Sequence, residues 1–330
     1  MEVQNLLHMK EGVGQDSYAD NSHIQKSVTA HAMSVLEESI KEVYHALKPK
    51  CFMMADMGCS SGPNALFAVS KIINAIDEAC RSLNCRAPEF GVFLNDLSGN
   101  DFNTLFNFVQ GFYKWVEEEK GRDFGPCFVP EGLVSNDGVA LNKGNICTAK
   151  TSPPEVQKAY YAQFKRDFTL FLSSRAREVV PGGCMVLTFL GSIQSTNPRP
   201  MHELLGCTLN QMALEGMIEE EKVDKFNIPF YAASVEEVRQ LVKAEGSFIL
   251  SKLETFTVDG NVHSIDDPKY QAKFHAESAR AVLESLLANA FGADIIDGLF
   301  FRFETRIHEH ITAGRPIEYL NLLVSMTKKA

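Results

Sequence analysis

Hydrophobic and polar positions recur along the chain with two periods, and these periods predict a series of helices and strands. Residues 25–48 carry apolar side chains at helical spacing, whereas the short apolar run 51–57 is typical of a strand buried on both faces. A glycine-containing turn leads from this strand into a second helical pattern at 65–83. The same order recurs with a strand at 89–94 and a helix at 102–119. This alternation predicts a Rossmann-like, doubly wound α/β sheet.

The second half of the chain is richer in helices and adds three strands. The pattern predicts a helix at 154–179 followed by a buried strand at 184–190. The remaining expected elements are helices near 201–217, 234–245, 270–290 and 294–310 and strands at 248–258 and 319–326. Because no repeat or low-complexity linker divides the chain, we expect one composite domain over residues 1–330. Its Rossmann-like core covers about 50–200, 247–258 and 318–328, and its helical cap covers about 201–246 and 270–313.

Composition and charge exclude several classes of protein. The 32 Lys and Arg residues against 42 Asp and Glu give a net charge of −10, which argues against a nucleic-acid partner. The eight cysteines form no C-x-x-C pair and indicate free thiols in a reducing compartment. The sequence shows no signal peptide and no apolar run long enough to cross a membrane, so we expect a soluble, cytoplasmic protein.

Two acidic residues follow or end the first two predicted strands, where α/β sheets bind their ligands. Asp56 precedes a turn that differs from the dinucleotide pattern G-x-G-x-x-G, and it suits a ligand with a cationic amine or serves as a structural turn acid. Asp96 can accept hydrogen bonds from both hydroxyls of a ribose; the alternative role of helix cap fits Asp101 better. The two acids together suggest S-adenosylmethionine as the ligand.

Longer motifs carry a specific resemblance. They are ADMGCSSGPN (55–64), FLNDLSGNDFNTLF (93–106), LNKGNI (141–146), KTSPPEVQKAYYAQFKRDFTLFL (150–172), VPGGCMVLTFLG (180–191) and EGMIEEEKVDKFNIPFY (215–231). Their order resembles that of the plant SABATH family, which includes salicylate, benzoate and jasmonate carboxyl methyltransferases and the N-methyltransferases of the caffeine pathway. The resemblance runs from Met1 to the last strand and implies a class I methyltransferase fold with S-adenosylmethionine as cofactor.

The resemblance also implies which residues bind small molecules. The cofactor-binding positions that match are Tyr18, Ser22, Asp56, Cys59, Asn64, Asp96 and Leu97. The acceptor-binding positions that match are Lys10, Gln25, Tyr231, Val282 and Tyr319. Core packing or a solvated surface explains many of these residues equally well, but an aromatic face such as that of Tyr18 can attract a sulfonium. We expect no catalytic residue in the strict sense, because no nucleophile and base pattern stands out.

A magnesium site is a further implication of the resemblance. The matching positions are Asn142, Asp224, Phe226 through its backbone carbonyl, and Asn227. Oxygen ligands suit a hard cation, but a single charged ligand makes a weak site whose role would be structural. Without the family, Asp224 and Asn227 are typical of a helix end and turn before Pro229.

The chain departs from the family after Val129. Homologues continue there with a segment that ends in a pattern close to LHFxHSSYSLxWLSxV, and about 30 residues are missing here, roughly what a strand and its connections require. That segment supplies the strand beside the first one, a contact to the adenine and side chains that hold the acceptor. His202 also stands where several carboxyl methyltransferases carry Trp.

These observations favour methyl transfer from S-adenosylmethionine to the carboxyl group of a small aromatic or related plant acid. A carboxylate is already a nucleophile at neutral pH, so the enzyme needs mainly to align and desolvate it. N-methylation of a xanthine is the first alternative. The second is a catalytically impaired paralogue that only binds cofactor or dimerises, since the resemblance implies a homodimer.

Overall fold

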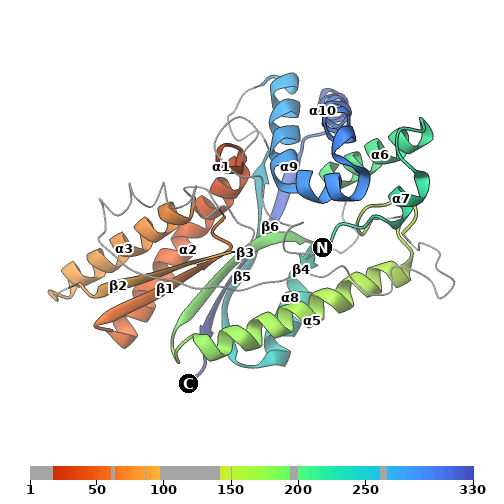
Figure 1. Ribbon diagram of the computed structural model, residues 1–330. Coiled ribbons are helices and arrows are strands. Elements are labelled where there is room, and N and C mark those ends of the chain that lie inside the picture. Colours follow the sequence, from red (N-terminus) through yellow and green to blue (C-terminus); the bar gives the residue numbers. More distant parts are fainter. Residues whose placement is uncertain are drawn as a thin grey trace.

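The structure is a computed structural model, and it describes residues 18–60, 64–85, 87–96, 142–149, 151–193, 200–260 and 266–330. The helices are α1 (Tyr18–Asn21), α2 (His23–Leu47), α3 (Asn64–Ser82), α5 (Pro154–Glu178), α6 (Pro200–Leu214), α7 (Glu220–Lys225), α8 (Val235–Glu245), α9 (Pro268–Phe291) and α10 (Ile296–Thr312), with a 3-10 turn η2 (Ala293–Ile295). The strands are β1 (Cys51–Met57), β2 (Glu89–Asn95), β3 (Cys184–Ser192), β4 (Ala233–Ser234), β5 (Phe248–Asp259) and β6 (Glu318–Lys328). Figure 1 shows α2 and α3 beside β1 and β2, with α6, α9 and α10 gathered at the other end of the molecule.

The long elements that the sequence predicts are confirmed, whereas three short elements of the structure were not predicted. Every helix and strand expected within the described residues is present, with ends that differ by a few residues. The helix expected at 102–119 lies outside the described residues. The sequence pattern did not predict α1, α7 or β4, because elements of two to six residues are too short to show a period.

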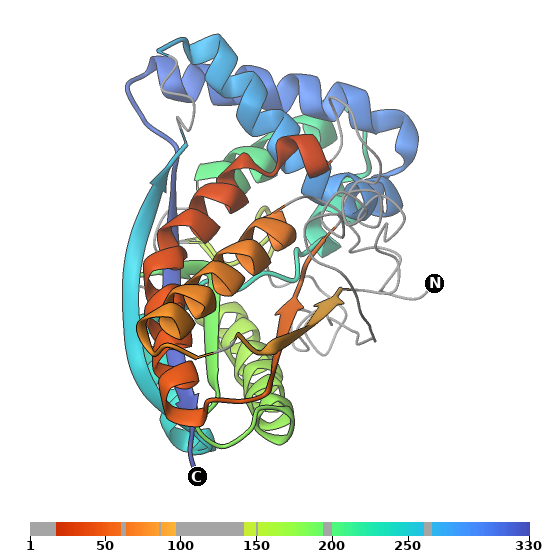
Figure 2. The same ribbon diagram turned by 90° about the vertical axis from the view of Figure 1, so that its left-hand side faces the viewer.

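The described strands form a two-stranded and a four-stranded sheet. β1 and β2 pair in parallel, with Cys51 opposite Glu89 and Met57 opposite Asn95. The second sheet has the order β4-β3-β6-β5, and β6 runs antiparallel to both β3 and β5. Within the described residues no strand bridges β1 and β3, and Figure 2 shows the two groups of strands apart. The doubly wound α/β class is confirmed, but β5 and β6 join only the sheet of β3.

Alternation along β6 determines which helices cover the larger sheet. Leu322, Val324 and Met326 pack with α5 and α8, whereas Leu323 packs with α2 and β5. Ser325, on the same face as Leu323, lies within hydrogen-bond distance of Ser39 of α2 (3.0 Å between the hydroxyl oxygens). Successive strand residues point to opposite faces, so the sheet is buried on both sides.

The helical cap has its own core. Leu205 and Leu209 of α6, Phe226 after α7, and Phe300 and Phe303 of α10 belong to one cluster that also includes α9. The boundary expected from the sequence differs at α8, which packs against α5 and β5 on the sheet rather than with the cap. α8 is well defined locally, because Ser234 and Glu237 form a reciprocal capping box at its start.

Candidate functional site

The turn after β1 is bonded to the end of β2. The amides of Gly58 and Cys59 both donate to the carbonyl oxygen of Asn95, at 2.7 Å and 3.0 Å. Gly58 adopts φ +101°, a conformation that only glycine enters without strain. The chain therefore needs glycine at this position to turn back on the neighbouring strand, and Asn95 is a site residue that the sequence analysis did not single out.

Ser60 connects the same turn to Asp96. Its backbone amide donates to Asp96 Oδ2 at 2.6 Å, and its φ of +51° is left-handed. Turns at the carboxyl ends of strands in α/β sheets commonly bind ligands through their amides. Here the N–H groups of Gly58, Cys59 and Ser60 bind Asn95 and Asp96 instead. The signal that could have found Ser60 is its place in the turn, opposite the acid that follows β2.

Asp56 and Asp96 lie at the carboxyl ends of adjacent strands and repel each other. Burial, and then the charge of Asp96, raise the pKa of Asp56 to about 6. No lysine or arginine among the described residues forms an ion pair with Asp56. Two carboxylates that share a partly buried site stabilise a cationic ligand, because the ligand removes their mutual repulsion.

Tyr18 and Cys59 border this acid pair. Burial raises the pKa of the Tyr18 hydroxyl to about 12, and Asp96 and Asp56 act in the same direction. Burial and the same two acids raise the pKa of the Cys59 thiol to about 12. Both side chains therefore stay neutral at pH 7. Cys59 is not a nucleophile here, and the site offers an uncharged aromatic ring beside two carboxylates.

A second contact joins α2 to the start of α3. The side-chain amide of Asn64 donates to Ser22, at 3.1 Å to the hydroxyl and 3.3 Å to the backbone carbonyl. Ser22 immediately precedes α2, and Asn64 is the first residue of α3. The structure thus joins Ser22 to Asn64 and gathers Tyr18, Asp56, Cys59 and Asp96, all predicted at the cofactor.

The predicted acceptor residues are distributed over several elements. Leu97 of the cofactor set and Lys10 of the acceptor set lie outside the described residues. Gln25 lies in the first turn of α2, and its side-chain oxygen is buried with no hydrogen-bond partner among the described residues. Val282 lies half-buried on α9.

Two tyrosines of the acceptor set have partners in the protein. The Tyr231 hydroxyl donates to Glu237 at 2.7 Å, and its ring packs 5.3 Å from that of Phe164. The Tyr319 hydroxyl lies 2.9 Å from Nδ1 of buried His275, whose pKa burial lowers to about 4. Tyr231 and Tyr319 therefore serve local packing, whatever else they contact.

The residues of the predicted magnesium site come together, but protein donors bind side-chain oxygens of Asn142, Asp224 and Asn227. Asn142 donates from its amide to Asn227 Oδ1 (2.7 Å) and accepts from Ser152 (2.7 Å). Asp224 pairs with the ammonium of Lys143 at 2.9 Å. Phe226 is buried, with its ring 4.9 Å from Phe291. No group of three or more His, Cys, Asp or Glu side chains in the described part of the chain is arranged so that it could hold a metal ion. This arrangement does not fit a bound cation unless Lys143 and the Asn142 amide move.

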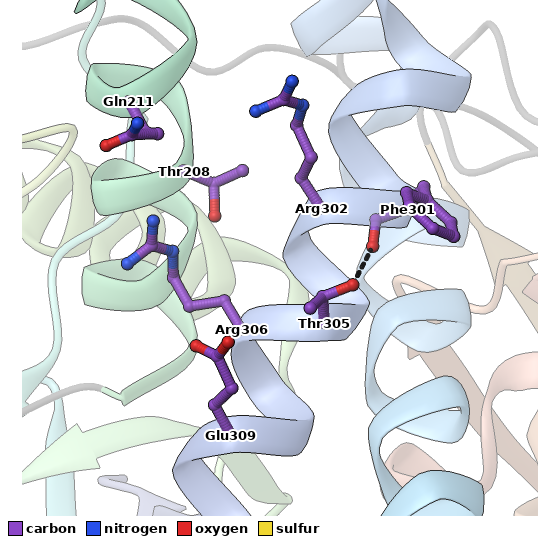
Figure 3. Close-up of a pocket in the computed structure, with 7 residues that line it drawn as sticks. All are labelled: Thr208, Gln211, Phe301, Arg302, Thr305, Arg306 and Glu309. Atoms are coloured by element: carbon purple, nitrogen blue, oxygen red, sulfur yellow. Dashed lines mark hydrogen bonds between the residues drawn. The ribbon is translucent and has the colours of Figure 1, made fainter.

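A separate shallow pocket of about 230 Å³ lies between α6 and α10. Figure 3 shows Thr208 and Gln211 on one side and Arg302 and Arg306 on the other. Arg302 pairs with Glu215 at 2.8 Å. None of the predicted cofactor residues lines this pocket, so the acid pair marks the candidate site.

The described residues also include no helix long and apolar enough to span a membrane.

Comparison with known proteins identifies the family of the chain. The family model described as "SAM dependent carboxyl methyltransferase" matches residues 4–129 and 127–329. The match breaks where the sequence analysis expects the missing segment. A probable jasmonic acid carboxyl methyltransferase of Theobroma cacao is 37% identical over 374 residues, covering 100% of both chains. Because that alignment is longer than this 330-residue chain, the relative carries residues that this chain lacks.

Other relatives act on different acceptors by name. A benzoic acid/salicylic acid carboxyl methyltransferase of Petunia hybrida is 37% identical, covering 99% of both chains. A probable caffeine synthase of Coffea arabica is 38% identical, covering 100% of this chain and 98% of the relative. The solved structure of a loganic acid methyltransferase with SAH superposes with a TM-score of 0.84 at 29% identity, covering 98% of this chain and 99% of that one. The chain belongs to the SAM-dependent carboxyl methyltransferase family and is an S-adenosylmethionine-dependent methyltransferase.

Proposed function

We propose that the acceptor is the carboxylate of a small aromatic or related plant acid. The observation that carries the proposal is the half-buried side chain of Gln25, whose Oε1 is buried and has no hydrogen-bond partner among the described residues. Buried polar groups are normally hydrogen-bonded, so such a group is a candidate for contact with a ligand. The amide oxygen can only accept, so a half-turn of the amide about its last torsion is required to place the NH2 group there, where it can donate to a carboxylate.

The position of Gln25 supports a role beside the cofactor. Gln25 follows Ser22 by three residues, and residues three apart lie on the same face at the start of a helix. Ser22 is bonded to Asn64, so this face of α2 is turned toward the predicted cofactor residues. An acceptor held by Gln25 would lie near the methyl donor.

The described site suits a reaction that needs no general base. S-adenosylmethionine supplies an activated methyl group when bound. Asp56 and Asp96 would hold its cationic and hydroxyl-bearing parts, while neutral Tyr18 presents an aromatic ring to a sulfonium. A carboxylate acceptor then requires alignment and exclusion of water rather than proton removal.

The test is a methyl-transfer assay over benzoate-like and jasmonate-like acids and over xanthines, with S-adenosylmethionine as donor. We expect turnover of acids and a rise in KM for the acid in Gln25→Leu. Gln240→Leu is the matched control, since Gln240 lies on exposed α8 surface and bonds only to Glu236 in the described structure. Turnover confined to xanthines would refute the carboxylate proposal and favour N-methylation, which the similarity to caffeine synthases keeps as an alternative.

A second candidate is a paralogue that binds cofactor with little turnover. The break in the family match and the separation of β1 from β3 favour it. Isothermal titration together with the methyl-transfer assay separates this candidate from the first, because the second candidate predicts S-adenosylmethionine binding without methyl transfer to the acids or the xanthines.

Dimerisation and a cytoplasmic location remain predictions. Analytical ultracentrifugation checks the first of these.

The magnesium site also remains a prediction from the family. Binding would require a cation to replace the Lys143 ammonium at Asp224. Thermal unfolding with Mg²⁺ and with a chelator tests it: a rise in melting temperature that Asp224→Asn abolishes would support a structural ion. Equal melting temperatures in both solutions would refute the structural ion, and the ion pair with Lys143 would then be the contact that holds Asp224.

A further inference from the structure

The C-terminal end of α3 brings two thiols together, independently of the proposed function. The amide of Cys85 donates to the carbonyl of Cys80 at 3.0 Å, and the amide of Asn84 donates to that of Arg81 at 3.2 Å. Asn84 has a left-handed φ of +50°. These bonds define a Schellman motif, in which the side chains at the first and last positions commonly pack against each other. Here those positions are Cys80 and Cys85.

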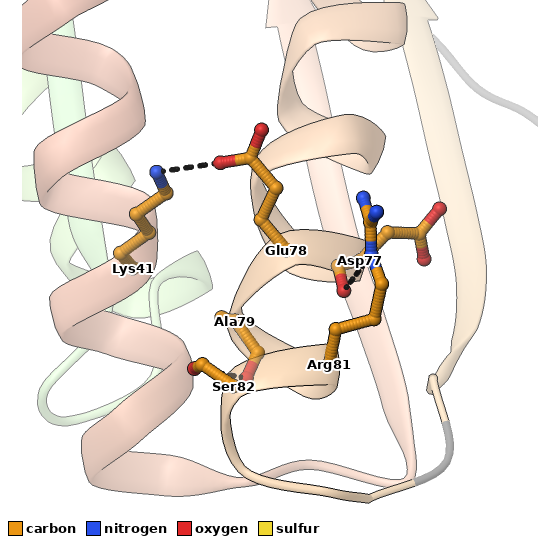
Figure 4. A network of polar contacts seen from close by, with 6 residues as sticks. All are labelled: Lys41, Asp77, Glu78, Ala79, Arg81 and Ser82. Atoms are coloured by element: carbon orange, nitrogen blue, oxygen red, sulfur yellow. Dashed lines mark hydrogen bonds and ion pairs between the residues drawn. The ribbon is translucent and has the colours of Figure 1, made fainter.

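Tyr44 confirms that the two sulfurs converge. Its hydroxyl accepts from Cys80 Sγ at 3.0 Å and lies 3.6 Å from Cys85 Sγ. Cys85 also contributes to raising the pKa of the Cys80 thiol, in agreement with two neighbouring sulfurs. Tyr44 is buried on α2, and Figure 4 shows this end of α3 beside α2, joined by the Lys41–Glu78 ion pair (3.0 Å). The surrounding contacts therefore hold the pair in place.

The two thiols differ in access. Cys85 is exposed, whereas Cys80 is buried. Burial raises the pKa of the Cys80 thiol, and the hydrogen bond with Tyr44 opposes that rise. An exposed thiol that reacts first, next to a protected thiol that resolves the product, is the arrangement of a redox-sensitive pair.

We propose that Cys80 and Cys85 form a reversible intrachain disulfide when the chain meets a small disulfide oxidant such as glutathione disulfide. The thiolate of Cys85 attacks one sulfur of the oxidant, its S–S bond breaks, and one glutathione leaves and takes up the proton that Cys85 lost. Cys80, as its thiolate, then attacks the Cys85 sulfur of the mixed disulfide and releases the second glutathione with the other proton. Two protein thiols are oxidised and one glutathione disulfide is reduced to two glutathiones.

Peptide mapping of the parent chain tests this step without any variant that could misfold. After treatment with glutathione disulfide and alkylation of free thiols, trypsin cleaves after Lys71, Arg81 and Arg86, which places Cys80 and Cys85 on separate peptides. We expect peptides 72–81 and 82–86 to be recovered as one cross-linked species, lighter by two hydrogen atoms than their sum, and dithiothreitol to separate them.

Two variants sharpen the result. Cys80→Ser should retain glutathione on peptide 82–86, because no resolving thiol remains, whereas Cys207→Ser should cross-link like the parent. Cys207 is an exposed thiol on α6 and is the matched control. The proposal is overturned if the parent keeps glutathione on Cys85 without a cross-link, or if Cys85 is recovered joined to a different cysteine.

Discussion

Strands β1 and β6 have similar apolar sequences but very different surroundings. In β6, which lies between β3 and β5, Leu322, Val324 and Met326 are completely buried under α5 and α8. In β1, which the described structure pairs only with β2, Met53 and Met57 are 56% and 41% exposed. Apolar sequence thus makes both segments strands, but only the strand with neighbours on both edges is enclosed.

The candidate site lies in the less enclosed half. Asp56, Cys59 and Asp96 follow or end β1 and β2, and the polar bonds between turn and strand end hold them in position. The half built on β3, β5 and β6 supplies buried area and a cap instead. We therefore expect the missing strand to weaken the half built on β1 and β2, which carries the predicted cofactor residues, more than the half built on the larger sheet.

The largest expected effect comes from restoring the segment that relatives carry after Val129. Inserting the family's strand segment between Val129 and Pro130 should raise both the melting temperature and the rate of methyl transfer. Unpaired buried backbone groups cost about 1–3 kcal/mol each, and misplacing an acceptor by about 1 Å can cost on the order of 100-fold in rate. Differential scanning fluorimetry and a methyl-transfer assay measure the two effects.

A glycine–serine insertion of equal length at the same position is the control, because it lengthens the chain without offering strand residues. If the 330-residue chain already methylates its acid as fast as the lengthened one, the missing strand is dispensable and the two halves differ only in packing.

Truncating one residue in each half tests the difference in burial. Leu322→Ala should lower the free energy of unfolding by about 2–5 kcal/mol, since it leaves a cavity in a completely buried position. Met53→Ala should change it by only about 0.5 kcal/mol, since Met53 is exposed. Urea denaturation of both variants measures the two values; similar losses would mean that β1 is as enclosed as β6.

Removing the carboxylate of Asp96 should weaken the cofactor half without unfolding the other. Asp96→Ala loses charge-assisted bonds to ribose hydroxyls worth roughly 1.5–3 kcal/mol each, so S-adenosylmethionine affinity should fall about tenfold or more. Asp77→Ala, at the far end of α3, is the matched control. Equal affinity of the Asp96 variant and the parent in isothermal titration would remove Asp96 from the site.

The two halves should also respond to pH in opposite directions. Asp56 has a pKa of about 6 in the folded protein, against an ordinary value of 3.8. Between these values the folded state binds more protons than the unfolded state, so the contribution of Asp56 to stability falls as the pH rises from about 4 to 6. His275, with a pKa of about 4 against 6.5, contributes stability that is gained as the pH rises from about 4 to 6.5. Each contribution is on the order of 1–3 kcal/mol.

Single variants separate these contributions. Asp56→Asn should raise the melting temperature near pH 7 while weakening S-adenosylmethionine binding, and its stability should then rise with pH between about 4 and 6.5. In His275→Gln the titration of Asp56 remains, so stability should fall as the pH rises from about 4 to 6. Parallel pH profiles for the two variants would show that neither group titrates as described.

Much of the fold follows from local patterns that the sequence displays. The long helices and strands could be located because their apolar positions recur over many residues. Asp56 and Asp96 could be chosen because strand ends bind ligands in α/β sheets. The short β4 and the role of Ser60 could not be found this way. Ser60 matters only because its amide meets Asp96, a residue of another strand.

The sequence by itself determined the α/β class, the position of the acid pair and the family, because these depend on periodicity and on motifs that lie close together in the chain. Only the tertiary structure decided that no described strand joins β1 to β3, that α8 covers the sheet, and that Lys143 pairs with Asp224. Those outcomes depend on contacts between residues that are far apart in the sequence. Which of several possible partners a residue contacts cannot be predicted from the spacing of residues along the chain.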